Sequence, residues 1–418
     1  MAEVAQRYRP PSAWLYYLLA GLARILLPLV LGVRIRRDPA VRKLRGPLLI
    51  IGNHPSFLDP VYMAVAMLPR RIHFLTSRIF FRSWLGTTFF RQLAAIPKIQ
   101  FRTDSQAVKS MFRVIRAGGS LAVYPEGQRS LDGGSQPFDD AIAKLALKLA
   151  CPVVIVKVEG GYLTWPRWSQ SKFRPGRVEV GTRLLYTSEQ LKSLDVMTVQ
   201  AGIAQALDFQ DYEWQKHRRH AYFSLAPALG LHNLCHQCPA CGQELAMRST
   251  RFFLTCSHCG NQARIDRFGG LRQSRVPLIT PGRPRVLPDP YQWRQWQLGE
   301  MAERIARPDF LFDFPAEAEF VSVEGLARSA GSGRLQLTCG ELVFTGDADP
   351  SGIRDPLQIR FPIRNMLGFS AVYGKKFELV LAGQTYRFTP QPGQAVVLLT
   401  DAIQTLKNQL DKPGGVSG

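Results

Sequence analysis

One short segment contains two side chains that together suit proton transfer. Residues 53–59 (NHPSFLD) place His54 and Asp59 five positions apart. An imidazole takes a proton from an alcohol only in its correct tautomer, and a nearby carboxylate fixes that tautomer and stabilises the imidazolium as it forms. The pair predicts a general base and the acid that orients it. The same spacing also fits a surface histidine beside an aspartate that caps a helix.

A second polar segment combines an arginine with a flexible turn. Residues 124–130 (YPEGQRS) contain Gly127 and Arg129. Arginine grips phosphate with a planar fork of donors, and glycine lets the backbone approach a ligand closely. The segment therefore predicts a phosphate site, although an exposed turn with a local ion pair would explain the same residues.

Both segments directly follow apolar runs that predict buried strands. Strands that alternate with helices predict an α/β domain with a largely parallel sheet over residues 41–225. Loops at the ends of such strands commonly carry catalytic groups, so both polar segments are expected at one edge of the sheet. The predicted strands are 47–52, 120–124 and 153–158, and helical spacing of apolar positions covers 105–117 and 139–150.

In this order the segments resemble the glycerolipid acyltransferase family whose type member is 1-acylglycerol-3-phosphate acyltransferase (PlsC-type). That family carries N-H-x-S-x-x-D, a stretch ending in Arg, F-P-E-G-T-R-S and a V-P-V strand. The matching blocks here are NHPSFLD, AAIPKIQFR ending at Arg102, YPEGQRS and CPVVIV, within residues 20–190. Gln128 replaces the usual Thr, an exchange that we expect to change little. In the fourth block VVI replaces VPV, and this second departure leaves the acceptor's identity open.

The resemblance implies a sheet flanked by helices and a direct acyl transfer in which His54 is the base and Asp59 orients it. The donor would be acyl-CoA or acyl carrier protein, and the acceptor 1-acylglycerol 3-phosphate or a related lysophospholipid, in phospholipid biosynthesis or remodelling. No catalytic cofactor is expected. The residues that would bind the acceptor are Glu126, Gly127 and Arg129, with Arg102 assisting on the phosphate.

The chain is long enough for two or three domains and carries a large positive charge. Its 418 residues include 53 Lys and Arg against 32 Asp and Glu, a formal charge of +21. Residues 70–113 hold nine of these cations and the single acid Asp104. Such an excess predicts a polyanionic partner, either nucleic acid or an anionic membrane surface.

An apolar run near the N-terminus favours the membrane. Residues 14–33 are interrupted only by Arg24 and Pro28, and 20 residues is about the length that spans a bilayer core. A basic flank follows at residues 34–45 where a signal peptide would have a cleavage site. We expect residues 1–40 to associate with the cytoplasmic face of a membrane, the bacterial inner membrane, by spanning it or by lying in its plane.

Five of the seven cysteines fall within residues 235–259, which is metal spacing and suggests a reducing compartment. The pairs Cys238/Cys241 and Cys256/Cys259 form two C-x-x-C knuckles with fourteen residues between them. They predict a zinc ribbon over 226–265, in which four thiolates fill the coordination of a structural zinc. We expect the neighbouring Cys235, His236 and His258 to be bystanders.

The remaining chain predicts a linker and a small β domain. Residues 266–315 are rich in Pro and Arg and contain one predicted helix, 291–305. Residues 316–418 show short alternating runs followed by a helical pattern, which predicts a barrel or sandwich with a capping helix. The domain is similar to PH-like modules in strand count and closing helix.

Two other classes of protein compete with the enzyme. A zinc-ribbon nucleic-acid-binding protein would use the ribbon and the positive charge, but it explains neither the apolar run nor the two ordered blocks, so no nucleic-acid partner is expected. A non-catalytic membrane scaffold with the same fold is the other alternative. The presence of His54, Asp59, Glu126 and Arg129 favours the enzyme.

Overall fold

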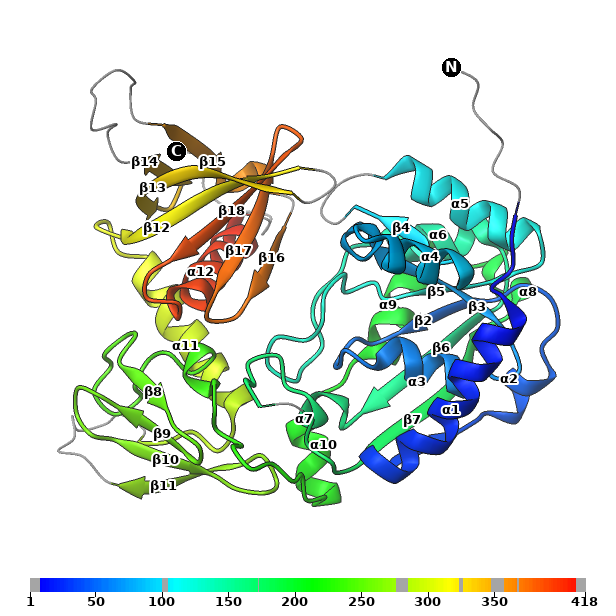
Figure 1. Ribbon diagram of the computed structural model, residues 1–418, viewed down its shortest axis with the longest axis horizontal. Coiled ribbons are helices and arrows are strands. Elements are labelled where there is room, and N and C mark those ends of the chain that lie inside the picture. The colour runs from blue at the N-terminus through cyan, green and yellow to red at the C-terminus, as the bar shows by residue number, and fades with distance from the viewer. Residues whose placement is uncertain are drawn as a thin grey trace. The chain divides into compact units, whose positions relative to one another are not determined.

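The computed structural model divides into two units, which Figure 1 shows with their labelled elements. The first comprises residues 1–167 and 173–223, and the second comprises 168–172 and 224–418. The five-part division drawn from the sequence stays a prediction. The structure describes residues 8–99, 104–171, 173–275, 285–322, 326–346, 357–366 and 368–410.

A seven-stranded sheet forms the centre of the first unit. All neighbouring strands are parallel except β6 and β7, so the predicted α/β sheet is confirmed. The strands β2, β5 and β6 run in one direction, and their carboxyl ends share an edge. In spatial order the strands are β1 (Val33–Arg36), β7 (Val178–Tyr186), β6 (Val153–Glu159), β2 (Leu49–Gly52), β5 (Ser120–Val123), β3 (Ile72–Ser77) and β4 (Ile96–Lys98).

Helices cover both faces of this sheet, which explains why its central strands are mainly apolar. Side chains of α1 (Ala13–Leu31) and α3 (Asp59–Ala66) pack with Ile50 and Val154 on one face. On the other face, α5 (Ser105–Arg116), α6 (Ala141–Leu149) and α9 (Val196–Leu207) pack with Leu49 and Val153. The shorter helices are α2 (Pro39–Lys43), η1 (Arg78–Phe81), α4 (Trp84–Gln92), α7 (Gly161–Thr164), α8 (Ser188–Leu191) and α10 (Asp211–Arg218).

The basic segment after the apolar run belongs to the sheet. Helix α1 ends at Gly32, whose φ of 61° favours glycine, and a Cβ there would collide with the carbonyl oxygen of Gly176. The chain then enters β1, whose Arg34 lies opposite Glu179 of β7 in parallel register. Residues 34–36 of the basic flank thus belong to the edge strand, and residues 39–43 form α2.

The second unit begins with a four-stranded antiparallel sheet in the cysteine-rich module. A turn stabilised by Asp266, whose Oδ1 accepts the N–H groups of Phe268 and Gly270, adds β11 from the stretch that was predicted as linker. The strands in spatial order are β11 (Leu271–Arg275), β10 (Gln262–Ile265), β9 (Phe253–Cys256) and β8 (Met247–Ser249), preceded by η2 (Leu231–Asn233).

The C-terminal part of this unit is a seven-stranded antiparallel sheet with a final helix, as predicted. Helix α11 (Pro290–Ile305) contributes Met301 to the core of this sheet, and its Arg294 forms a buried ion pair of 2.7 Å with Asp401 of α12 (Ala395–Leu410). The strands in spatial order are β15 (Gln358–Pro362), β14 (Glu341–Gly346), β13 (Ala327–Leu337), β12 (Phe312–Val321), β18 (Gln384–Pro390), β17 (Lys376–Leu381) and β16 (Phe369–Val372), with η3 (Ile363–Asn365) after β15.

Candidate active site

The segment after β2 is fixed to the structure on two sides. The side chain of Asn53 donates to the carbonyl oxygen of Val158 on β6 and accepts the N–H of the same residue, both at 2.8 Å. The carbonyl oxygen of His54 accepts the N–H of Ser130 at 2.8 Å, which ties the segment to the turn after β5. The two polar segments are thus brought together at the shared edge of the sheet, as their positions after β2 and β5 predict.

His54 and Asp59 are in direct contact. The His54 Nδ1 lies 2.7 Å from Oδ2 of Asp59, which is the first residue of α3 and is fully buried. The same oxygen accepts the N–H of Ser56 at 2.7 Å. Because that oxygen is already an acceptor, we assign the proton to Nδ1 of His54, which leaves a lone pair on Nε2. The ring therefore has the tautomer that a general base needs.

The surroundings of His54 keep its ring neutral. The ring stacks on Tyr124 with centroids 4.5 Å apart, and the side chain is 19% exposed. Burial, together with the charges of Arg129 and Arg167, lowers the pKa of His54 from 6.5 to about 3. Burial raises the pKa of Asp59, while the N–H of Ser56 and the charge of Arg129 act in the opposite direction. The imidazole is thus unprotonated at neutral pH, which is the state from which a general base acts.

Arg129 lies beside an aromatic cluster. Its guanidinium carbon is 5.6 Å from the centroid of the Phe57 ring, and Phe57 contacts Trp165 with centroids 5.4 Å apart. Trp165 in turn contacts Phe173. The side chains of Phe57 and Phe173 are about half exposed. This arrangement places a cation next to an exposed apolar surface.

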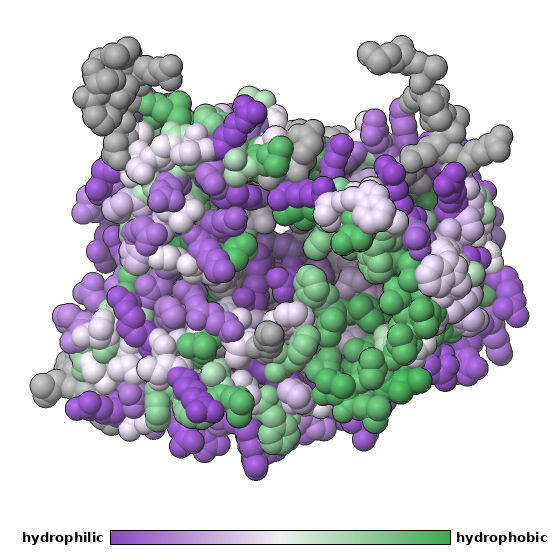
Figure 2. All heavy atoms as spheres, viewed as in Figure 1, coloured by the Kyte–Doolittle hydropathy of each residue, from purple (hydrophilic) through white to green (hydrophobic). Residues whose placement is uncertain are grey.

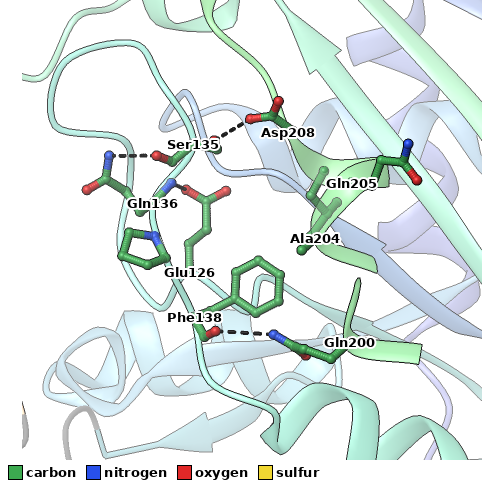
Figure 3. Close-up of a pocket in the computed structure, with 10 residues that line it drawn as sticks. Glu126, Ser135, Gln136, Phe138, Gln200, Ala204, Gln205 and Asp208 are labelled. Carbon is green, nitrogen blue, oxygen red and sulfur yellow. Dashed lines mark hydrogen bonds between the residues drawn. The ribbon is translucent and has the colours of Figure 1, made fainter. Parts of the chain in front are cut away.

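Glu126 faces the main chain. One carboxylate oxygen accepts the N–H of His54 and the other accepts the N–H of Gln136, both at 3.1 Å. Burial raises the pKa of Glu126 to about 8, whereas these two N–H donors lower it. Figure 3 shows Glu126 and Gln136 at the wall of a pocket that also includes Phe138 and Ala204. The resemblance implies that Glu126 binds the acceptor. In the structure its two carboxylate oxygens each accept a backbone N–H, one from the loop of His54 and one from the loop of Gln136.

Gly127 and Arg102 were also predicted to bind the acceptor, and only Gly127 lies in the part of the chain that the structure describes. Gly127 has a φ of 69°, its N–H donates to the carbonyl oxygen of Tyr124, and a Cβ there would meet no atom within 4 Å. The turn therefore leaves open space next to Arg129, where glycine is favoured. Arg102 lies outside the described residues.

One residue near the site was not singled out by the sequence. Arg167 donates to the carbonyl oxygen of Arg129, and its charge acts on His54. It lies in residues 160–168 (GGYLTWPRW), an aromatic and basic stretch after β6, and its separation of 38 positions from Arg129 gives no local signal of the contact.

The four cysteines of the two knuckles meet in the second unit. Their Sγ atoms lie within 4.8 Å of one another, with 3.7 Å between Cys238 and Cys259 and 3.8 Å between Cys241 and Cys256. These separations are too long for disulfides. Four sulfurs bound at ~2.3 Å to one tetrahedral ion would be ~3.8 Å apart, so the arrangement fits zinc. The neighbouring Cys235, His236 and His258 do not belong to the group.

The first unit thus has the sheet, the His–Asp pair and the arginine turn that the family blocks imply, which defines its class as an acyltransferase domain. Residues 33–159 match the family model described as Acyltransferase. The resemblance drawn from the sequence is confirmed for this domain, which is similar to PlsC-type glycerolipid acyltransferases.

Several relatives carry the same family name. A chloroplastic 1-acyl-sn-glycerol-3-phosphate acyltransferase from Brassica napus is 26% identical over 136 residues, which are 32% of this chain and 39% of the relative. The 1-acyl-sn-glycerol-3-phosphate acyltransferase of Bacillus subtilis is 20% identical over 167 residues, 40% of this chain and 79% of the relative. The chain is also similar to the crystal structure of the 1-acyl-sn-glycerophosphate acyltransferase PlsC from Thermotoga maritima, with 20% sequence identity and a TM-score of 0.37. The match covers 46% of this chain and 78% of that chain. The chain thus spans less than half of the Brassica napus relative.

Proposed function

We propose that this protein transfers a fatty acyl group from an acyl thioester, acyl-CoA or acyl carrier protein, to the free hydroxyl of 1-acylglycerol 3-phosphate or a related lysophospholipid. The observation that carries the proposal is the contact of 2.7 Å between His54 and Asp59, next to the turn that contains Arg129. The relatives named above support the choice of acceptor.

In the proposed reaction the Nε2 atom of His54 takes the proton of the acceptor hydroxyl while the hydroxyl oxygen attacks the thioester carbonyl carbon. Asp59 holds the ring in place and stabilises the imidazolium. The carbon–sulfur bond then breaks, and the thiolate leaves and takes up the proton from His54. Arg129 would hold the acceptor phosphate, with Arg102 assisting, so that the hydroxyl lies near the base.

We further propose that α1 attaches the protein to the cytoplasmic face of a membrane, the bacterial inner membrane. It is the one helix in the described residues that is long and apolar enough to cross a bilayer. Trp14, Leu22 and Leu29 on its outer side are at least half exposed. Figure 2 shows a hydrophobic patch over the area that α1 occupies in Figure 1. Helix α4 adds Trp84, which is 78% exposed.

The contacts of α1 favour a position in the plane of the membrane. Its inner side is buried through Tyr16, Ala20 and Leu27. Its N-terminal end is attached to α4, because the N–H of Ser12 donates to the carbonyl oxygen of Gln92 at 2.8 Å. Its C-terminal end continues directly into β1. Crossing a bilayer would require the helix to leave this packing, whereas in-plane binding keeps it.

The metal proposed for the four cysteines is a structural zinc. All four ligands come from the protein, so no coordination position remains for a substrate. The reaction above needs no metal, and we propose that the ribbon supports the fold of the second unit.

A direct assay tests the proposed function. The purified protein, reconstituted with lipid, is given acyl-CoA or acyl carrier protein as donor and a panel of lysophospholipids and glycerol 3-phosphate as acceptors. Mass spectrometry should detect phosphatidate from 1-acylglycerol 3-phosphate, and the His54→Ala protein serves as the matched control. Product formed equally by both proteins, or by neither, would contradict the proposal.

A further inference from the structure

The four-stranded sheet of the cysteine-rich module has one buried face and one exposed face. Its strands, β8 to β11, are labelled in Figure 1. Met247, Leu254 and Ile265 point to the inner face and are almost completely buried. Side chains alternate between the two faces along a strand, and directly opposed residues of neighbouring antiparallel strands share a face. The register of the strands therefore decides which side chains lie together on the exposed face.

Four arginines lie on that exposed face. Gln262 and Arg264 alternate with the buried Ala263 on β10, so the two rows of opposed residues that contain them lie on the exposed side. One row contains Arg248, Thr255, Gln262 and Arg275, and the other contains Phe253, Arg264 and Arg272. All four arginines are exposed, and the side chain of Arg272 is 74% exposed. The arginine face is defined as Arg248, Arg264, Arg272 and Arg275.

The arginine face has little negative charge to balance it. Residues 247–275 contain six arginines and a single acid, Asp266. The Oδ2 atom of Asp266 lies 3.1 Å from Nε of Arg272, so this acid balances one of the six. Arg248 donates to two carbonyl oxygens at 2.8 Å, which are neutral groups and leave its charge unbalanced. A concentrated positive surface of this kind attracts a polyanion.

The side chains around these arginines favour a lipid surface over a nucleic acid. Proteins that bind single strands stack the bases on exposed aromatic rings. Phe253, which is partly buried, is the one aromatic residue in the four strands, all of which the structure describes. In the turns, the guanidinium of Arg251 lies over the Phe252 ring, 5.1 Å from its centroid. That of Arg267 lies 5.0 Å from the centroid of the Phe268 ring. Headgroup phosphates need the charges but no stacking rings.

We propose that the arginine face binds the anionic headgroups of a membrane and attaches the second unit to it independently of α1. A second contact in a chain that is already bound through α1 acts at a high effective concentration, so it adds strongly to the overall affinity. The ribbon then has a function besides supporting the fold: its zinc would hold β9, which ends at Cys256, and so keep the arginines in place. The inference does not depend on the proposed acyl transfer.

The test removes charge from the arginine face of the full chain. Arg264→Gln, Arg272→Gln and Arg275→Gln are combined in one face variant. Each cation beside an anionic leaflet contributes about fivefold to the affinity. We therefore expect the face variant to bind vesicles at least about tenfold less tightly in a sedimentation assay. The vesicles contain equal parts of phosphatidylglycerol and phosphatidylcholine, and vesicles of phosphatidylcholine alone should not distinguish the two proteins.

A matched control removes the same charge elsewhere in the second unit. It combines Arg307→Gln, Arg328→Gln and Arg360→Gln, at three exposed positions outside the ribbon. Its binding to the mixed vesicles should stay within about twofold of the unchanged protein, because its arginine face is intact. An equal loss in the face variant and in the control would overturn the inference, since net charge alone would then explain both.

Leu22→Glu with Leu29→Glu separates the contribution of α1. In this background the remaining binding should require phosphatidylglycerol and should fall with salt, because the Debye length shortens from about 10 Å at 0.1 M to about 3 Å at 1 M. Neutralising the arginine face should remove it, and lysine at the same three positions should restore most of it, because lysine keeps the charge. Remaining binding that is indifferent to the face or to salt would overturn the inference.

Competition decides between a membrane and another polyanion. A single-stranded oligonucleotide or acyl carrier protein, added at the same concentration of negative charge as the vesicles, should leave the protein on the vesicles. Displacement by either one would overturn the inference in favour of that partner. Zinc content and hydrogen exchange of residues 226–265 check that the face variant is folded. If it loses zinc, the salt dependence and the competition, both measured with the intact arginine face, still decide the outcome.

Discussion

The carboxylate of Glu126 accepts the backbone N–H of His54 at a distance of 3.1 Å, so the two family blocks are joined through the main chain of the base itself. Its second oxygen accepts the N–H of Gln136. Glu126 therefore holds the His54 segment against the loop after β5. We propose that Glu126 positions the base, whereas the family resemblance implies that it binds the acceptor.

Glu126→Gln should distinguish these roles. A glutamine offers one carbonyl oxygen, and its amide NH₂ would face a backbone N–H, so one buried donor would lose its partner at a cost of roughly 1–3 kcal/mol. We expect kcat to fall by about tenfold or more while the acceptor KM stays within about twofold. Steady-state kinetics with varied acceptor measure both. A rise in KM without a fall in kcat would return Glu126 to the acceptor site.

Local patterns in the sequence were sufficient for three strands of the sheet, β2, β5 and β6, and for the His–Asp pair. Predicted strand 47–52 corresponds to β2, Leu49–Gly52, because a strand buried on both faces is a continuous apolar run. His54 and Asp59 are close in sequence, and a turn followed by the first residue of a helix brings them together. Both features depend on residues that are close in sequence, and a local sequence pattern can predict such features.

Features that depend on distant partners were not predictable in this way. Strand β1 has only four residues, VRIR, and exists because β7, about 145 positions later, pairs with it. The contact between Arg167 and Arg129 likewise depends on the tertiary fold. For Glu126, the residue type shows a carboxylate but not whether it faces a ligand or the main chain.

Removing the base should abolish turnover without affecting the fold. His54→Ala should lose about a hundredfold or more in kcat, the usual range for a general base. Asp59→Asn should also cripple the reaction, because the charge that orients the ring and stabilises the imidazolium is lost. Circular dichroism and vesicle binding serve as controls. Near-normal turnover by a folded His54→Ala protein would exclude the mechanism.

The lowered pKa of His54 predicts a change of stability with pH. In the folded chain the ring stays neutral down to about pH 3, whereas the unfolded chain takes up a proton near the ordinary value of 6.5. Between these values the unfolded state binds more protons, so the contribution of His54 is present above pH 6.5 and is lost as the pH falls toward 3. His54→Gln should flatten this part of the curve, measured as the midpoint of urea unfolding from pH 4 to 7. A curve that keeps its slope in His54→Gln would contradict the assignment.

Charges on the outer side of α1 should release the protein from membranes. Leu22→Glu combined with Leu29→Glu replaces two exposed leucines, each of which contributes roughly 1.5–3 kcal/mol when it is buried in lipid. We expect at least a tenfold loss of binding to anionic vesicles in a sedimentation assay. Met197→Glu, at a position of α9 that is 82% exposed, is the control and should bind normally. Resistance of the unchanged protein to extraction at high pH would argue for a spanning helix instead.

The cysteine group should hold one zinc ion per chain and should be needed for the fold of the second unit. Elemental analysis should find the metal, and Cys238→Ser with Cys241→Ser should remove it. The loss should reach α11, because Trp293 Nε1 donates to the carbonyl oxygen of Gln237 at 3.0 Å and Gln297 Nε2 donates to that of Leu234 at 2.9 Å. Hydrogen exchange should therefore rise in residues 226–265 and in α11.

The same variant tests whether zinc takes part in the reaction. His54 and Asp59 lie in the first unit, and the four cysteines lie in the second, so kcat per folded molecule should survive the loss of zinc. The thiolates leave no open position on the ion for substrate, and the proposed reaction already has a base, an orienting acid and a phosphate site. In the decisive experiment a mild chelator removes zinc, turnover is measured, and hydrogen exchange monitors the fold of the first unit. If turnover stops at once with that unit intact and returns when zinc is added, the ion belongs to the active site and its structural role is wrong.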